Sequence, residues 1–378
     1  MVLVRTFIEN LLYQKMSHVK LSRSILIGFK MPENNSELYS DLISKAKRIS
    51  ADASAPRTVA VLGAGAMGMG IAFVLAQKAS INVSLYDIDA NQFKSAKDVP
   101  LIRTTTDLSG AIESADLVIE AVPEIISLKR EVVSRCVDQF VATNTSTFKV
   151  EDISSRSNFG GMHFFNPVSK MPLVEVVSGP STSEETIAIL CKTSLAMGKV
   201  PLVCNDCSGF VVNRMLMPYL IEFDKMVSKG HNFVHIDDVM RNHGWPMGPA
   251  ELCDLVGLDV IYHGSQSIAK AYDHISVAEE SMCHRLYKNG ALGRKTHGGF
   301  YSYGPISYDK YGPLAKEGGT RESSAKIRDR LMSPMLEEAS RLLDENIVDS
   351  VAEINAALAL GAGLPPFVGE GFGAKGQG

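Results

Sequence analysis

The feature that most constrains this chain is a glycine-rich turn that directly follows an apolar strand pattern. Thr58-Val-Ala-Val-Leu-Gly63 has the pattern of a buried strand, and Gly63-Ala-Gly65-Ala-Met-Gly68 leads from it into a helical stretch, Met69 to Lys78. In that context Gly63 permits a tight turn, Gly65 lets the backbone approach a diphosphate, and Gly68 lets the helix pack close to the strand. Backbone N–H groups at the helix start would then bind the phosphates. The turn predicts a dinucleotide site, although a turn without any phosphate remains open for such a motif alone.

An acidic residue supports the dinucleotide interpretation. The next strand pattern, Val83 to Tyr86, is followed at once by Asp87. A carboxylate at this point can accept hydrogen bonds from the ribose hydroxyls, and it would repel a 2'-phosphate. We therefore expect NAD rather than NADP. The alternative is that Asp87 caps a helix over Ala90 to Lys97. Its position relative to the glycines favours the role of binding the ribose hydroxyls.

Strand patterns and helical stretches alternate as far as Cys204, which predicts βαβ units and a mainly parallel sheet. After Gly209 only helical patterns follow. The fold class expected is therefore an α/β Rossmann-type doubly wound sheet followed by an all-α domain. The expected strands are Thr58–Gly63, Val83–Tyr86, Leu117–Val122, Phe140–Thr143, Met162–Phe165, Leu173–Val177 and Leu202–Cys204, and the expected later helices are Val211–Ser228, Ile236–His243 and Pro249–Tyr272.

An internal similarity suggests a partial second helical repeat. Asn213-Arg-Met-Leu-Met-Pro218 is echoed by Asp329-Arg-Leu-Met-Ser-Pro334, and His243-Gly-Trp-Pro246 by Ala362-Gly-Leu-Pro365, in the same order. Chance similarity between amphipathic helices is the alternative, and the shared Arg and Pro weigh against it. Because the copy has Asp329 in place of Asn213, we expect it to serve in packing.

These patterns predict five segments. Residues 1–55 form an N-terminal extension or linker, because Ser54-Ala-Pro56 breaks a helical pattern over Leu38 to Ile49 and order is expected to begin at Thr58. Residues 56–206 form the NAD-binding domain and residues 207–304 a helical domain for substrate and dimerisation. Residues 305–324 form a Pro- and Gly-rich linker, and residues 325–378 the partial repeat.

Composition excludes several classes of function. With a formal charge of −4 the chain has no general basic field for nucleic acid or anionic membranes, and no run approaches the length of a membrane span. The six cysteines are scattered, which fits a reducing compartment without disulfides. Cys204 and Cys207 form a C-x-x-C, but no second pair would complete a zinc site, so no metal is expected. They are interpreted as two small buried residues at a strand end.

A histidine and a glutamate form the candidate catalytic pair. His163 follows a strand-rich stretch, and Glu175 lies within the apolar pattern Leu173-Val-Glu-Val-Val177. A carboxylate flanked by valines is costly to bury unless it is paired, and an imidazole is its best partner. Such a pair fixes the histidine tautomer and leaves the other ring nitrogen free to exchange a proton. Each residue alone also has an ordinary structural interpretation, His163 as a hydrogen-bonded core residue and Glu175 as an edge-strand residue that faces water.

At this point the sequence resembles the 3-hydroxyacyl-CoA dehydrogenases, and especially the dehydrogenase part of multifunctional β-oxidation enzymes. The similarity extends over nearly the whole span from Thr58 to Tyr303. It is carried by the glycine turn with Met67 and Gly70, Asn144-Thr-Ser146, His163-Phe-Phe-Asn-Pro167 through Glu175, Gly209-Phe-Val-Val-Asn213-Arg214, Pro246-Met-Gly-Pro249 and Gly293-Arg-Lys-Thr-His-Gly-Gly-Phe-Tyr301.

The resemblance implies NAD-dependent oxidation of a (3S)-3-hydroxyacyl-CoA to the 3-ketoacyl-CoA. It implies that His163 is the base in oxidation and the acid in reduction, with Glu175 orienting it. Ser146 and Asn213 are implied as hydrogen-bond partners of the substrate's C3 oxygen and thioester region. Their alternatives are a turn residue for Ser146 and a helix cap for Asn213.

Three further residues are implied at the cofactor. Glu124 and Lys129 match positions that contact it, and Asn166 matches one that helps to hold the site; a solvated helix face is the alternative for Glu124 and Lys129. The resemblance also makes a homodimer possible, and it favours a peroxisomal or cytoplasmic location over a mitochondrial one.

One departure from the family pattern affects the substrate. The family usually has a helical hairpin that covers the acyl-CoA, and the connection from Asp87 to Arg103 is too short to form it. Two alternative functions therefore stay open: a non-catalytic NAD-binding relative, and a dehydrogenase of a free hydroxy acid.

Overall fold

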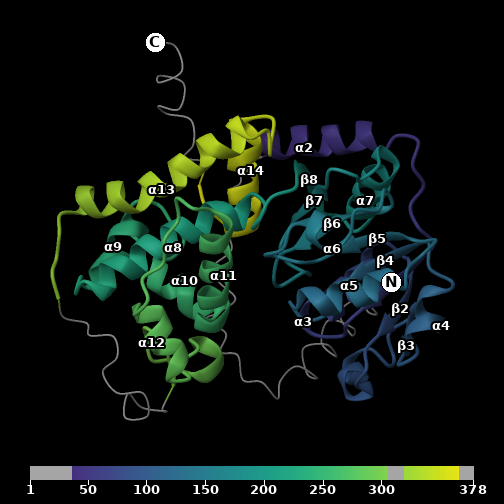
Figure 1. Cartoon of the computed structure of the whole chain (residues 1–378), viewed down its shortest axis with the longest axis horizontal. Coiled ribbons are helices and arrows are strands. Elements are labelled where there is room, and N and C mark those ends of the chain that lie inside the picture. The colour runs from purple at the N-terminus through teal and green to yellow at the C-terminus, as the bar shows by residue number, and fades with distance from the viewer. Residues whose placement is uncertain (1–35, 305–318, 366–378) are drawn as a thin grey trace, which may run out of the picture. The chain divides into compact units, whose positions relative to one another are not determined.

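A computed structural model describes residues 36–304 and 319–365, all within one compact unit, Asn35–Gly378 (Figure 1). Expectations for residues 1–35, 305–318 and 366–378 lie outside the described residues. The strands are β1 (Thr58–Leu62), β2 (Asn82–Tyr86), β3 (Ile102–Thr105), β4 (Leu117–Glu120), β5 (Phe140–Thr143), β6 (Phe159–Phe164), β7 (Leu173–Ser178) and β8 (Val200–Asn205). The helices of the sheet region are α3 (Ala66–Lys78), η2 (Ala90–Ser95), α4 (Leu108–Ile112), α5 (Ile126–Ser134), α6 (Val150–Ile153) and α7 (Glu184–Ala196).

The eight strands form one sheet in the order β3-β2-β1-β4-β5-β6-β7-β8. All neighbours are parallel except β6 and β7, which are antiparallel. The chain leaves β1 toward β2 and β3 and then returns to the other side of β1 with β4. The strand order therefore reverses at the carboxyl ends of β1 and β4, where sheets of this kind bind their ligands. This arrangement confirms the Rossmann-type sheet.

The alternation of side chains along the strands builds two cores. Val59 and Val61 of β1 face a core that includes α3 and α7, whereas Ala60 and Leu62 face a core that includes α4 and α5. The second core continues into the helical part of the chain. The helices thus cover both faces of the sheet, as the doubly wound pattern predicts.

The helical domain that follows is also confirmed, although its helices begin and end at slightly different residues from those expected. Its helices are α8 (Val212–Ser228), α9 (Phe233–Asn242), α10 (Pro249–Val256), α11 (Leu258–Ala271), α12 (Met282–Lys288) and η3 (Arg294–Thr296). The stretch expected as further helix over Pro249–Tyr272 is confirmed as helical, and it is divided into α10 and α11. The helical path is interrupted at Gly257, whose φ of +108° is incompatible with a continuous α-helix. The apolar periodicity on both sides hides this break.

Two more helices, α13 (Ser324–Asp344) and α14 (Val351–Ala362), occupy the segment expected as a partial repeat. α13 packs against α8, the helix that it echoes in sequence, and each of the two carries an internal proline, Pro218 and Pro334. Both segments are thus helical, while their duplication stays a prediction.

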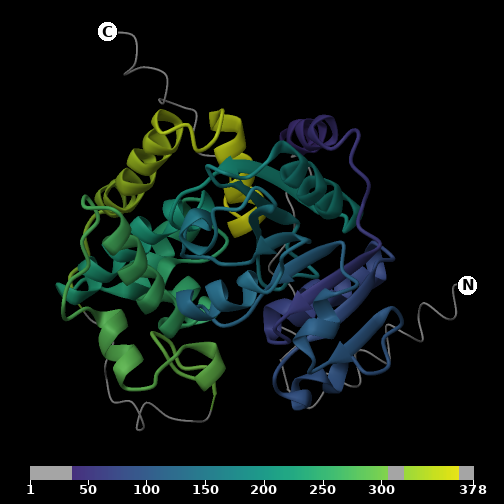
Figure 2. The same ribbon diagram turned by 45° about the vertical axis from the view of Figure 1, so that its right-hand side comes forward.

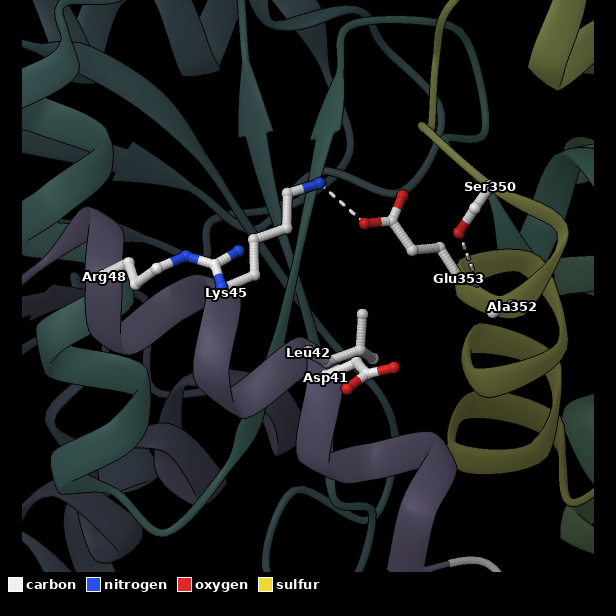
Figure 3. A pocket seen from close by; sticks show the side chains of 7 residues that line it. All are labelled: Asp41, Leu42, Lys45, Arg48, Ser350, Ala352 and Glu353. Carbon is white, nitrogen blue, oxygen red and sulfur yellow. Dashed lines mark hydrogen bonds and ion pairs between the residues drawn. The ribbon is translucent and has the colours of Figure 1, made fainter.

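The structure differs from the expectation that order begins at Thr58. Residues before it form α2 (Ser36–Ile49), which packs against β8, α7 and α14 (Figures 1 and 2). Figure 3 shows the junction with α14, a cavity of about 190 Å³ across which Lys45 Nζ reaches Glu353 Oε1 at 2.6 Å. The break at Ser54-Ala-Pro56 therefore separates α2 from β1 without separating α2 from the sheet.

Candidate active site

The glycine turn lies between β1 and α3, at the reversal point of the sheet. Gly63 has a φ of +104°, and a Cβ placed on it would lie 2.5 Å from the carbonyl oxygen of Ala121. A Cβ on Gly68 would lie 1.8 Å from the carbonyl oxygen of Gly63, whereas one on Gly65 would meet nothing within 4 Å. Gly63 and Gly68 are thus required by the turn itself. The space beside Gly65 is open, as a diphosphate that approaches the backbone would need.

Asp87 lies beside this turn. Its Oδ2 accepts a hydrogen bond from the backbone N–H of Ala64 at 2.8 Å, and its Oδ1 accepts one from Asp89 at 2.9 Å. The alternative role as a helix cap is wrong, because Asp89 caps η2 by accepting from the backbone N–H of Asn91. Asp87 therefore lies where a carboxylate can face the ribose of a dinucleotide.

The start of α3 fits a phosphate group. Gly65 precedes the helix without a side-chain cap, and the first turn holds no acidic residue. Its backbone N–H groups, aligned with the positive end of the helix dipole, favour an anion. The loop after β6 contacts the same helix, since a Cβ on Gly70 would lie 3.0 Å from Val168. The residues present therefore fit NAD.

The expected catalytic pair is formed. His163 and Glu175 are directly opposite in the antiparallel β6–β7 ladder, and His163 Nδ1 lies 2.6 Å from Glu175 Oε2. The side chains of Phe159 on β6 and Leu173 on β7 belong to the core shared with the helical domain, so strand alternation places His163 and Glu175 on that face. His163 is 5% exposed and Glu175 is fully buried, so the alternative of Glu175 as an edge-strand residue that faces water is wrong. His163 is a buried, hydrogen-bonded histidine, and its catalytic role stays a prediction.

The other oxygen of Glu175 is bound by the start of α8. Its Oε1 accepts hydrogen bonds from the backbone N–H groups of Val211 at 3.1 Å and Val212 at 2.9 Å. Phe165 and Phe210 flank the imidazole, with ring centroids 4.6 and 5.6 Å from it. Both carboxylate oxygens are thus satisfied, and Nε2 is the imidazole nitrogen that is available for proton exchange.

Ser146 and Asn213 are brought together. The Asn213 side-chain amide donates to the backbone carbonyl of Ser146 at 3.3 Å. Because α8 begins at Val212 with Val211 as its N-cap, the alternative of Asn213 as a cap is wrong. Asn144, two residues before Ser146, accepts a hydrogen bond from the backbone N–H of Phe164 at 2.9 Å. The β5 loop is thus tied to the strand of His163 and to α8.

Glu124 holds the Ser146 loop from the other side. Its Oε1 accepts from the backbone N–H groups of Ser146 and Thr147, each at 3.1 Å, and from the hydroxyl groups of Thr145 and Thr147. Burial alone would raise the pKa of Glu124, but the charge of Lys129 and these hydroxyl groups outweigh it and lower that pKa.

Lys129 is fully buried, so the alternative of a solvated helix face is wrong for this residue. Its Nζ contacts Glu120 Oε1 at 2.9 Å and Glu124 Oε2 at 3.1 Å. Glu120, which is also fully buried, accepts a further hydrogen bond from Thr143. Sequence reasoning missed Glu120, although it ends an apolar strand as Glu175 interrupts one. The same rule, that a buried carboxylate needs a partner, could have found it.

The remaining expected residues are simpler to place. Asn166 is exposed, two residues beyond the end of β6. Cys204 and Cys207 are buried at the end of β8, as predicted. Within residues 36–304 and 319–365, no cluster of three or more His, Cys, Asp or Glu side chains could hold a metal ion. In the same part of the chain, no helix has the length and apolar character needed to cross a bilayer.

A glycine turn at the reversal point of a mainly parallel sheet, with a histidine–carboxylate pair on the third and fourth strands beyond it, defines a dinucleotide-dependent α/β oxidoreductase. Two family models narrow this class. The 3-hydroxyacyl-CoA dehydrogenase NAD-binding domain matches residues 58–100 and 94–207, and the 3-hydroxyacyl-CoA dehydrogenase C-terminal domain matches residues 209–303. The chain therefore belongs to the 3-hydroxyacyl-CoA dehydrogenase family, and its cofactor is NAD.

The solved structures that it resembles agree. It is similar to 3-hydroxybutyryl-CoA dehydrogenase of Escherichia coli, with 25% identity, a TM-score of 0.66, and coverage of 81% of this chain and 88% of that one. It is also similar to (S)-3-hydroxybutyryl-CoA dehydrogenase PaaH1 of Ralstonia eutropha, with 31% identity, a TM-score of 0.59, and coverage of 66% and 99%. The dehydrogenase part of multifunctional enzyme 1 of C. elegans is 25% identical, with a TM-score of 0.55 and coverage of 81% and 78%.

A curated relative is longer than this chain. The fatty acid oxidation complex subunit alpha of Psychrobacter cryohalolentis is 38% identical over an alignment that covers 88% of this chain and 52% of the relative. The chain thus spans about half the length of the curated relatives that it matches. The NAD-binding family model matches in two pieces that meet between Asp87 and Arg103, where the structure has only η2 in place of a helical hairpin.

Proposed function

We propose that this chain oxidises (3S)-3-hydroxyacyl-CoA thioesters to 3-ketoacyl-CoA with NAD, through His163 as the proton acceptor. The observation that carries the proposal is the buried bond of 2.6 Å between His163 Nδ1 and Glu175 Oε2. An ionised carboxylate at Nδ1 keeps a proton on that nitrogen, so Nε2 is left with the lone pair that a base requires.

Bound NAD would supply the acceptor for the C3 hydride, held at the turn of Gly63, Gly65 and Gly68 and at Asp87. As the hydroxyl proton arrives at Nε2, the imidazole becomes positively charged, and Glu175 stabilises that charge from the other side. Glu175 itself remains in place because Val211 and Val212 donate to its second oxygen. In the reverse reaction the protonated imidazole returns the proton to the C3 oxygen.

Ser146 and Asn213 are proposed to bind the substrate's C3 oxygen and thioester region. Three contacts support this proposal. Asn213 bonds the backbone of Ser146, the loop of Ser146 is bonded to the His163 strand through Asn144, and the start of α8 is bonded to Glu175. Glu124 and Lys129 are proposed to serve the cofactor, with Glu124 also holding the Ser146 loop, and Asn166 to help hold the site. In this proposal, residues 56–206 bind NAD and residues 207–304 bind the substrate.

Fatty acid β-oxidation is the proposed setting, supported by the name of the Psychrobacter cryohalolentis relative, a fatty acid oxidation complex subunit alpha. Its bacterial origin supports a cytoplasmic location and gives no support to a peroxisomal one. The homodimer expected from the family resemblance stays a prediction, which sedimentation velocity would test.

The test follows NADH absorbance with acetoacetyl-CoA in the wild type and in His163→Gln. We expect turnover by the wild type and a loss of about a hundredfold or more in kcat in the variant, with NADH binding retained. Turnover of acetoacetate in preference to acetoacetyl-CoA would indicate a free hydroxy acid as the physiological substrate. A wild type that binds NADH but reduces neither compound would identify a non-catalytic binding protein.

A further inference from the structure

Arg214 directly follows Asn213, and it heads the largest fully buried side chains of the described residues. The proposed reaction does not use it. A guanidinium is always charged, so its complete burial has a high desolvation cost unless the surroundings supply matched partners. The position of this cation next to a proposed substrate-binding residue therefore requires an explanation.

The partners come from the C-terminal helical pair. Arg214 Nε donates to Glu338 Oε2 at 2.9 Å, and its two terminal nitrogens donate to the two oxygens of Glu345 at 2.6 and 2.7 Å. The guanidinium also lies 4.3 Å from the ring centroid of Tyr272. Bidentate pairing fixes the direction of an arginine as well as its position. α13 and the residue that follows it thus determine where Arg214 lies.

The same end of α8 carries three contacts to the active site. Val211 and Val212 donate their N–H groups to Glu175, and Asn213 donates to the carbonyl of Ser146. The N-cap residue Val211 makes no side-chain cap of its own, so the Glu175 carboxylate takes that place. Because a helix moves as a stiff unit, displacement of its first turn would break these contacts together. The anchor at Arg214 is one residue beyond them.

α14 supports the same point independently. A Cβ on Gly361 would lie 2.9 Å from a methyl group of Val212 and 2.9 Å from one of Leu173, the first residue of the Glu175 strand. The helix is therefore in close contact with both elements that hold the Glu175 carboxylate.

We propose that Glu338 and Glu345 are positioning residues, which act through Arg214 to hold the first turn of α8 against Glu175 and Ser146. The segment expected to serve in packing would then complete the active site. The catalytic part of this inference rests on the proposed function, and the structural part does not.

The chain offers a matched control. Arg330 of α13 bonds Glu222 of α8 at 2.6 Å, so Glu222→Ala breaks an ion pair between the same two helices two turns farther along α8. The test variant is Glu345→Ala, because this side chain is 46% exposed whereas that of Glu338 is only 2% exposed, and Glu338 remains to pair with Arg214. Glu345→Gln keeps the shape and one acceptor, and it serves as the conservative variant.

Two measurements are made on each protein: steady-state kinetics with acetoacetyl-CoA and NADH, and hydrogen–deuterium exchange of the peptide that spans residues 207–216. In Glu345→Ala we expect kcat to fall about tenfold or more, with the NADH Kd within about twofold of the wild type. Exchange in residues 207–216 should be about tenfold faster. Glu345→Gln should recover part of both losses, and Glu222→Ala should change neither by more than about twofold.

Unchanged exchange and unchanged kcat in Glu345→Ala would overturn the inference. So would equal effects in Glu222→Ala, because they would indicate that any loosening of α8 from α13 suffices. If the wild type shows no turnover, the proposed function fails, and the exchange measurement still decides whether Glu345 anchors the first turn of α8.

Discussion

Glu175 is a buried carboxylate with a full set of partners. His163 faces one of its oxygens, and the N–H groups of Val211 and Val212 face the other. Three donors from two elements leave the side chain a single orientation. The orientation of the imidazole follows from it, and so does the proton acceptor at Nε2.

Glu175→Gln should therefore impair catalysis while the protein stays folded. The amide keeps an oxygen for Val211 and Val212, but its NH₂ group would donate to Nδ1 and move the ring proton to Nε2. We expect kcat to fall about a hundredfold or more, because the base is then in the wrong tautomer. Stopped-flow measurement of NADH formation tests this, with NADH fluorescence titration to show an intact cofactor site. A variant with wild-type kcat would contradict the proposed role.

Asp237 predicts a pH dependence of stability. It is fully buried, accepts hydrogen bonds from the N–H groups of Ala250 and Glu251, and has its pKa raised to about 7, chiefly by burial. Between pH 4 and 7 the folded protein retains this proton and the unfolded chain releases it. Rising pH in that window therefore favours unfolding, by roughly 1 kcal/mol for each pH unit from this group.

Asp237→Asn removes this titration. Urea unfolding at pH 5, 6 and 7 should show the wild type losing stability relative to the variant as the pH rises. Asp238→Asn is the control, because that neighbouring side chain is 54% exposed and its substitution should leave the pH profile as in the wild type. A constant difference between Asp237→Asn and the wild type over this range would contradict the raised pKa.

The catalytic pair could be predicted because one rule about buried charge applied to adjacent strands. The buried Lys129–Glu120 pair obeys the same rule, yet Lys129 lies in a helix whose inward face was not evident from the sequence. Asp87 and Asp89 show another limit. Both are acids after the same strand, and only the folded turn determines which of them caps η2.

At the scale of elements, the glycines of the turn have different roles: Gly68 is needed for the fold, and Gly65 is proposed to be needed for the ligand. Gly68→Ala would place a methyl group 1.8 Å from the carbonyl oxygen of Gly63, so we expect a loss of stability of more than about 2 kcal/mol. Gly65→Ala would meet nothing within 4 Å and should leave stability unchanged. It should instead raise the NADH Kd about tenfold or more, because the methyl group occupies the space that a diphosphate approaches.

Thermal unfolding and NADH fluorescence titration on the two variants separate these effects. Unchanged NADH affinity in a well-folded Gly65→Ala would show that the open space beside this residue is not the phosphate site.

Strands with strong apolar patterns were the most predictable elements, since burial on both faces leaves a continuous apolar run. β3 was missed, because it is short and begins Ile102-Arg103 at the edge of the sheet, where one side remains polar. The break between α10 and α11 at Gly257 was missed because the apolar pattern there is strong and not because it is weak. Apolar residues continue on both sides of it, and a single glycine within a helical pattern does not by itself predict a break.

At the scale of the molecule, segments from both ends of the described chain support the central sheet. α2 packs against β8, the last strand in the order, and against α14, with Lys45 bonded to both Asp349 and Glu353. α14 in turn packs against β7, the strand of Glu175. The two bonds of Lys45 join residues about 300 positions apart in sequence, which local patterns do not reveal.

Leu42 tests whether α2 is part of this core. Its side chain is 3% exposed, so Leu42→Ala should lower the free energy of unfolding by about 2 to 5 kcal/mol through lost burial and the cavity that remains. Leu255→Ala is the matched control in another helix, because Leu255 is 40% exposed and its truncation should cost less than about 1 kcal/mol. Urea unfolding of both variants measures the difference. If Leu42→Ala costs no more than Leu255→Ala, then α2 does not contribute to the stability of the folded unit, as a linker helix would not. A large cost would instead establish that the sheet depends on a helix that precedes its first strand.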